Sequence, residues 1–80
     1  MTAPDRAAIV RLIRAELEDC DLGVRGCVLA RRDLVAANGP DSPLYPLTLL
    51  RDAFYAAREA TWVGHARRLR DLLAEMGEQP

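Results

Sequence analysis

The feature that most constrains this chain is an apolar stripe that keeps helical phase across its C-terminal half. The stripe members recur every three to five residues, and they are Leu47, Leu50, Phe54, Ala57, Trp62, His65, Leu69, Leu72 and Met76. Spacing that follows the 3.6-residue period over many turns is typical of an amphipathic helix. We therefore expect a long helix over about residues 46–76, closed by Gly77.

Two features of this predicted helix leave its shape open. The segment 61–64, Thr-Trp-Val-Gly, is a weak helix former, and a glycine inside a helix costs about 1 kcal/mol relative to alanine. The helix is therefore either continuous, with a bend near 61–64, or broken there into two. A second stripe of mostly small residues lies beside the first, and it comprises Leu49, Ala53, Ala56, Ala60 and Val63. A helix that is apolar over so wide an arc needs cover on more than one side.

The N-terminal half predicts two shorter helices. The first spans about residues 3–21, beginning at a capping-box pattern, Thr2 with Asp5, and ending before Gly23. The second spans about residues 24–37 and ends at the breaker sequence Asn38-Gly39-Pro40. Residues 39–46 form a proline-rich connector that excludes regular helix. Together these segments predict a single all-α domain, a small bundle of three (possibly four) helices with a long C-terminal helix.

Composition narrows the classes of function. The net charge is −1, all eleven basic residues are arginine, and acids and bases alternate along the chain. A broad nucleic-acid footprint requires a basic surface, so we expect no nucleic-acid partner. No apolar run approaches the ~20 residues that span a bilayer, and the first residues contain no apolar leader segment. We expect no membrane partner and a cytoplasmic location.

The residues that commonly carry chemistry lack partners at motif spacing. His65 is the only histidine and lies on the apolar stripe, without a nucleophile or acid placed to act with it. Six residues separate Cys20 from Cys27, a spacing that matches no zinc or redox motif, so both are interpreted as small buried side chains. We expect no catalytic residue, no cofactor and no metal site.

Two groups of residues are candidates for a protein interface. Tyr55, Arg58 and Trp62 are of the types enriched at binding hot spots, with core packing as the alternative. The acidic residues Glu18, Asp19 and Asp21 at the end of the first predicted helix, and the basic residues Arg67 and Arg68 on the last, are complementary in charge. The acidic cluster is either neutralised within the chain, by Arg25, Arg31 and Arg32, or meets the basic surface of a partner. The basic cluster is either a solvated face or docks on the acidic cluster of a second copy.

These observations favour a non-enzymatic helical module for protein–protein interaction. It would act by self-association, as a homo-oligomer, or by docking a partner protein, in the role of a small regulator, an adaptor or an accessory subunit of bacterial machinery. The alternative is a small helical enzyme or ligand-binding bundle in which Arg14, Arg31 and Arg58 converge on an anionic substrate.

Overall fold

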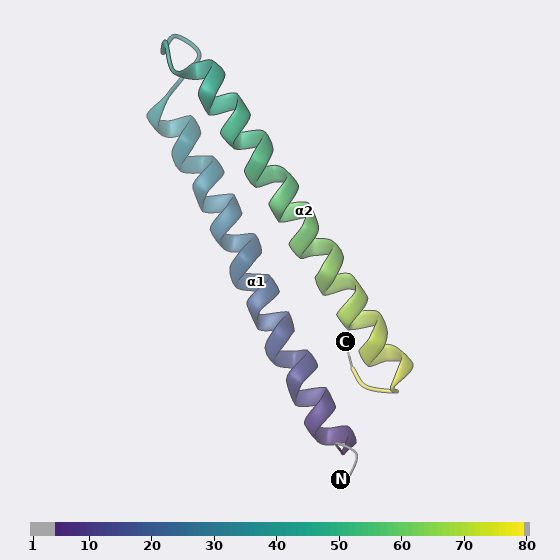
Figure 1. The fold of residues 1–80 in the computed structure, drawn as a ribbon. Helices are drawn as coiled ribbons and strands as arrows, with labels where there is room; N and C mark the ends of the chain where they lie inside the picture. Colours follow the sequence, from purple (N-terminus) through teal and green to yellow (C-terminus); the bar gives the residue numbers. More distant parts are fainter. Residues whose placement is uncertain (1–4, 80) are drawn as a thin grey trace.

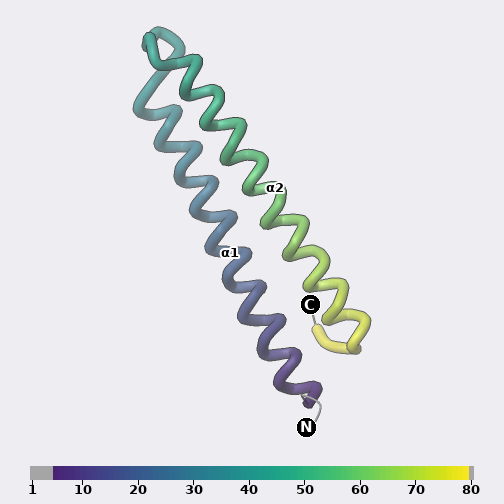
Figure 2. Tube along the Cα trace, viewed as in Figure 1, coloured from purple at the N-terminus to yellow at the C-terminus, as the bar shows by residue number. Residues whose placement is uncertain are grey.

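The protein is a hairpin of two long antiparallel helices (Figure 1). The computed structural model describes residues 5–79, and within them α1 runs from Arg6 to Ala37 and α2 from Tyr45 to Glu75, with no strand. The molecule is a rod of 60 × 21 × 18 Å. The connector lies at one end of the rod, and residues 5 and 79 lie near the other (Figure 2).

The predicted bundle of three or four helices is wrong, because the segments predicted as helices 3–21 and 24–37 form one helix, α1. Gly23 does not end a helix but receives the indole of Trp62 from α2. A Cβ atom at Gly23 would lie 2.6 Å from Trp62 Cδ2, closer than any side chain tolerates. The glycine is therefore required for close approach of the two helices. Trp62 itself lies in α2, which continues without a break through Gly64.

The N-terminus of α1 is capped by Asp5, whose carboxylate accepts a hydrogen bond of 2.7 Å from the backbone N–H of Ala8. The capping box predicted for Thr2 with Asp5 cannot be compared, since Thr2 lies outside the described residues. At the other end of the rod, the connector turns through backbone hydrogen bonds from Ser42 N to Gly39 O and from Tyr45 N to Ser42 O, both 3.0 Å. No helix in the described part of the chain is both long and apolar enough to cross a membrane.

The helices meet along a seam whose residues alternate at spacings of three and four. On α1 and its C-cap these residues are Val10, Ile13, Leu17, Cys20, Val24, Cys27, Arg31, Leu34 and Asn38. On α2 and its C-cap they are Tyr45, Thr48, Asp52, Tyr55, Glu59, Trp62, Ala66, Leu69, Leu73 and Met76. Every one of them is buried or half-buried. This is the heptad spacing of a coiled coil, here folded back on itself.

The seam corrects the predicted apolar stripe of the C-terminal half. Trp62, Leu69 and Met76 do lie on the seam, whereas the large residues Leu47, Leu50, Phe54 and Leu72 are exposed. The stripe was wrong because α2 packs on α1 through polar residues in its first half, so the apolar residues there point away.

We divide the rod into a terminal half, residues 5–21 and 64–79, and a loop half, residues 22–63. The apolar core lies in the terminal half, where Val10, Ile13 and Leu73 are buried and Leu17 and Leu69 pack against them. This end also has two ion pairs with Glu78. Its Oε1 lies 3.3 Å from Arg6 Nη2, and its Oε2 lies 3.7 Å from Arg14 Nη2. Arg6 additionally donates a hydrogen bond to the carbonyl of Met76.

Candidate interaction surface

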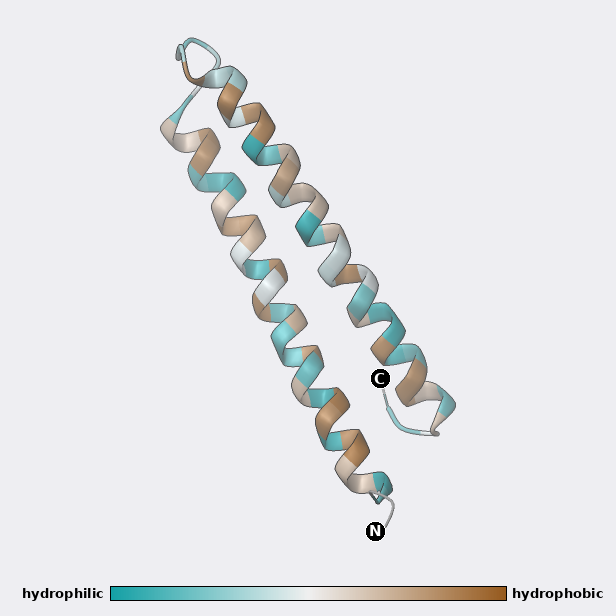
Figure 3. Ribbon diagram, viewed as in Figure 1, coloured by the Kyte–Doolittle hydropathy of each residue, from teal (hydrophilic) through white to brown (hydrophobic). Residues whose placement is uncertain are grey.

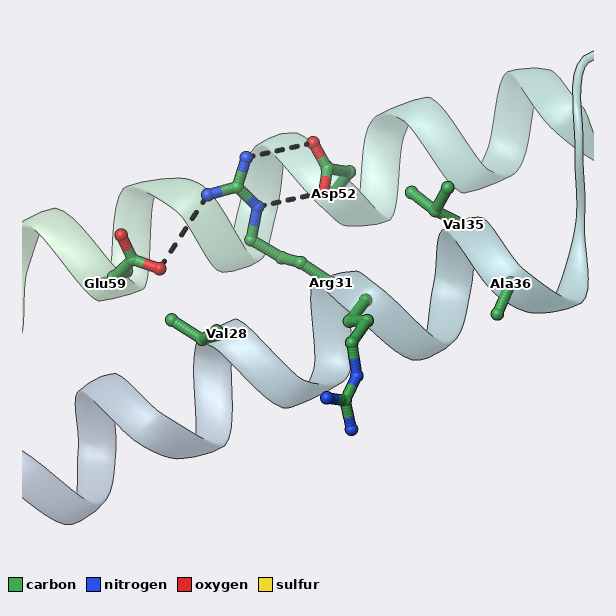
Figure 4. A pocket seen from close by; sticks show the side chains of 7 residues that line it. Val28, Arg31, Val35, Ala36, Asp52 and Glu59 are labelled. Atoms are coloured by element: carbon green, nitrogen blue, oxygen red, sulfur yellow. Dashed lines mark hydrogen bonds and ion pairs between the residues drawn. The ribbon is translucent and has the colours of Figure 1, made fainter.

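In the loop half, the seam is held by an arginine that crosses between the helices. Arg31 on α1 places Nε 2.9 Å from Asp52 Oδ1 and Nη1 3.7 Å from Glu59 Oε1, both on α2 (Figure 4). A second hydrogen bond, from Nη2 to Asp52 Oδ2, is 3.4 Å long. The hydrogen bonding to Asp52 and the charges of both carboxylates raise the pKa of Arg31.

A shallow groove runs over these ion pairs. Val28, Val35 and Ala36 contribute its apolar lining from α1, and Asp52 and Glu59 line it from α2 (Figure 4). The two valines are largely accessible, with 49% of Val28 and 63% of Val35 exposed. The groove therefore offers apolar surface above a polar floor.

Large hydrophobic side chains are exposed mainly in the loop half, and Figure 3 shows hydrophobic positions continuing along both helices toward the connector. Of twelve such exposed residues in the described part of the chain, ten lie there: Leu22, Val28, Leu29, Val35, Leu44, Leu47, Leu49, Leu50, Phe54 and Val63. The terminal half has Leu12 and Leu72. Such an accumulation on a small protein is characteristic of a surface that associates with another chain.

The exposed side of α2 is nearly free of charge through the loop half and as far as Gly64, the first residue of the terminal half on α2. Between residues 46 and 64, all positions outside the seam are uncharged except Arg51 and Arg58. Thr61, the one polar residue among them, donates its hydroxyl to the carbonyl of Ala57 at 3.0 Å. We call these uncharged residues the outer face of α2: Pro46, Leu47, Leu49, Leu50, Ala53, Phe54, Ala56, Ala57, Ala60, Thr61, Val63 and Gly64.

The structure distributes the predicted aromatic cluster over two surfaces. Tyr55 and Trp62 are half-buried on the seam, toward α1. Arg58 is exposed, with its guanidinium 5.5 Å from the centroid of the Phe54 ring, which in turn meets Tyr55 edge-to-face at 5.6 Å. The seam position of Trp62 gives it a packing role, and its place in an interface stays a prediction.

The predicted charged clusters are exposed in the terminal half. Glu18, Asp19 and Asp21 lie on α1, and Arg67 and Arg68 lie on α2. Among the described residues, no ion pair joins these two groups. At this level of the rod, the link between the helices is instead His65 Nε2 to Glu16 Oε2, at 3.2 Å.

The remaining candidates for chemistry are dispersed or buried. Both cysteines are free thiols on the seam, and burial together with the carboxylates of Glu16, Asp19 and Asp21 raises the pKa of Cys20. The described residues contain no group of three or more potential metal ligands. Arg14 and Arg31 are about 25 Å apart along α1, so the three arginines of the enzyme alternative do not converge.

Sequence reasoning missed the residues that set the pairing of the helices, namely Gly23, Arg31, Asp52 and Glu59. The signal was available in the alternating spacing from Val10 to Asn38, which passes both glycines of α1 without a change of phase. The prediction instead ended a helix before Gly23, because a glycine is a common helix C-terminus, and so it divided α1 into two helices.

Comparison with protein-family models, with curated proteins and with solved structures finds no match to this chain.

Proposed function

We propose that this protein is a non-enzymatic interaction module that associates with other protein chains, foremost with its own copies, through the loop half of the hairpin. The observation that carries this proposal is the polarity of that half, where charged residues enter the seam and large apolar side chains are exposed. Its seam contains Arg31, Thr48, Asp52 and Glu59, whereas its exposed surface contains most of the large apolar side chains.

The accessible area of the hairpin supports association. The chain exposes 6128 Å². A compact monomer of 8.9 kDa exposes about 4,800 Å². The excess, about 1,300 Å², is more than the ~800 Å² that each partner buries in a standard protein–protein interface.

The two-helix architecture also supports self-association. Each helix of a hairpin covers only one stripe of the other, so an apolar face outside that stripe is buried only when another helix packs on it. A second hairpin would supply that element and complete a four-helix arrangement. Arg58 and the charged residues Glu18, Asp19, Asp21, Arg67 and Arg68 would then serve as exposed polar contacts around the association surface.

We place this role, as a small regulator, adaptor or accessory subunit, in the cytoplasm, where reducing conditions keep thiols such as Cys20 and Cys27 unpaired.

The test is the solution mass, measured by light scattering over a range of protein concentrations. The expected mass is about 17.8 kDa, twice that of the chain, or a higher multiple. Leu50→Glu should reduce it toward 8.9 kDa, since it places a charge on the exposed apolar side of the loop half. The matched control is Leu12→Glu in the terminal half, because Leu12 and Leu50 have similar exposed fractions, 67% and 70%. A wild-type mass of one chain at all concentrations would contradict self-association.

A further inference from the structure

The outer face of α2 contains a second line of residues with the same alternating spacing as the seam. The line runs along the side of α2 away from α1, through Pro46, Leu50, Ala53, Ala57, Ala60 and Gly64. Spacings of four and three keep such a line straight along a supercoiled helix, so a partner helix can follow it over its whole length. Arg51 and Arg58 lie off this line, about a third of a turn around the helix.

The size of the side chains changes along this line. Its first part carries Leu50, flanked by Leu47 and Leu49, and its last part carries Ala57, Ala60 and Gly64. An antiparallel copy of the same helix reverses this order. In the register that aligns the two lines end to end, centred near residue 55, Leu50 of one chain would meet Ala60 of the other, and Pro46 would meet Gly64. A parallel copy would instead place leucine against leucine at one end and glycine against glycine at the other.

Gly64 provides a separate observation. A Cβ atom built on it meets no heavy atom within 4 Å beyond its own stretch of helix, so nothing in the hairpin requires a glycine there. Glycine is nevertheless among the poorest helix formers. Trp62 explains the glycine at position 23, but Gly26 is as open as Gly64, so open surroundings alone do not mark a contact. Gly64 supports the inference because it also lies on the uncharged line of α2.

We propose that the occupant of this face is a second copy of the chain, packed antiparallel on α2 about a two-fold axis near residues 53–57. The inference rests on the proposed self-association and specifies its surface and direction. In a two-fold interface, residue i meets residue j and j meets i, which is the relation that Leu50 and Ala60 satisfy. The absence of charge from the line allows both copies to be desolvated without leaving an unpaired ion.

The first experiment fills the space that the partner requires. Gly64→Leu should halve the mass measured by light scattering, from about 17.8 to 8.9 kDa, at concentrations where the wild-type chain is dimeric. Helical content by circular dichroism should not fall, since leucine favours helix over glycine. Gly26→Leu is the matched control, because Gly26 lies in the loop half of α1 with equally open surroundings, and its mass should not change.

The second experiment determines the direction of packing. In the antiparallel dimer, a Leu50→Cys chain mixed with an Ala60→Cys chain should form a disulfide between the two chains under mild oxidation. Neither variant alone should do so, because like positions are separated by about 15 Å along the helix. In a parallel dimer, the Leu50→Cys chain alone would cross-link and the mixture would not form the 50–60 bond.

The outcomes separate this inference from the function it rests on. A wild-type monomer overturns both. A wild-type dimer that persists in Gly64→Leu, or that fails to link positions 50 and 60, leaves self-association standing and overturns the antiparallel α2 interface.

Discussion

The two halves of the hairpin share one helix pairing and one seam spacing, yet they differ in where their charged and large apolar side chains lie. In the terminal half, Val10, Ile13 and Leu73 are buried and the charged residues face outward. In the loop half, Arg31 and Asp52 meet on the seam while Leu50 and its neighbours are exposed. The comparison shows that one spacing pairs the helices along the whole rod, whereas the two halves differ in how much large apolar surface they expose.

The difference also predicts where the stability of the single chain resides. Burying a large aliphatic side chain contributes about 1.5–3 kcal/mol. The ion pairs of Arg31 are partly exposed, and pairs of that kind contribute little. The terminal half should therefore hold the hairpin together, and the loop half should depend on association.

The largest effect is expected from removing a side chain of the terminal core. Leu73→Ala should lower the free energy of unfolding by about 2–5 kcal/mol, because the side chain is 1% exposed and its loss leaves a cavity. The adjacent Leu72→Ala is the control, since that side chain is 42% exposed. Urea unfolding followed by circular dichroism, at one protein concentration, measures both. Equal losses would contradict the placement of the core.

The next effect tests the contact where the halves meet. Gly23→Ala should lower the free energy of unfolding by about 1–3 kcal/mol, because the added methyl group overlaps the Trp62 indole. Gly26→Ala should raise it by about 0.5–1 kcal/mol, since the site is open and alanine favours helix. The same urea titration applies. Stabilisation by both substitutions would show that Trp62 does not pack on Gly23.

The smallest effect is a pH dependence. Burial and the nearby Glu16, Asp19 and Asp21 raise the pKa of the Cys20 thiol in the folded chain above its ordinary value of 9.0. The unfolded chain therefore loses this proton first, so the contribution of Cys20 to stability is constant well below the ordinary pKa of 9.0 and falls as the pH rises toward the folded pKa. Free energies of unfolding measured between pH 7 and 10 should show a shallower decline in Cys20→Ala than in the wild type. An identical decline in both would exclude Cys20 as the cause.

Some of the fold follows from local sequence rules. The helical class and the end of α1 near Asn38 depend on residues close in sequence, and these rules place them correctly. The connector, predicted over 39–46, ends earlier, because Pro46 is tolerated in the first turn of α2. The role of Gly23 depends on Trp62, which is distant from it in sequence. A glycine that ends a helix and a glycine that admits an indole have the same local sequence signal, so the short-range rules do not distinguish them; the alternating spacing along the whole of α1 does.

The candidate surface shows the same division. Tyr55, Arg58 and Trp62 were predicted as interface residues from their residue types. In the structure Tyr55 and Trp62 face α1, whereas Leu50 and Phe54 are exposed. The prediction assumed that the most apolar stripe of α2 would face its own chain. In the structure another side of α2 meets α1, with Asp52 and Glu59 paired to Arg31, and these pairs depend on α1 as well as on α2.

The alternating spacing of the seam limits how the length of this hairpin can change. One added residue in α1 would rotate everything beyond it by about 100°, taking Gly23 away from Trp62 or Arg31 away from Asp52. Seven added residues restore the rotational phase of α1. The contacts between the helices match again only if α2 also changes by seven at the same level, because the connector fixes the register of the two helices. Longer or shorter forms of this hairpin should therefore differ by paired heptads, one in each helix.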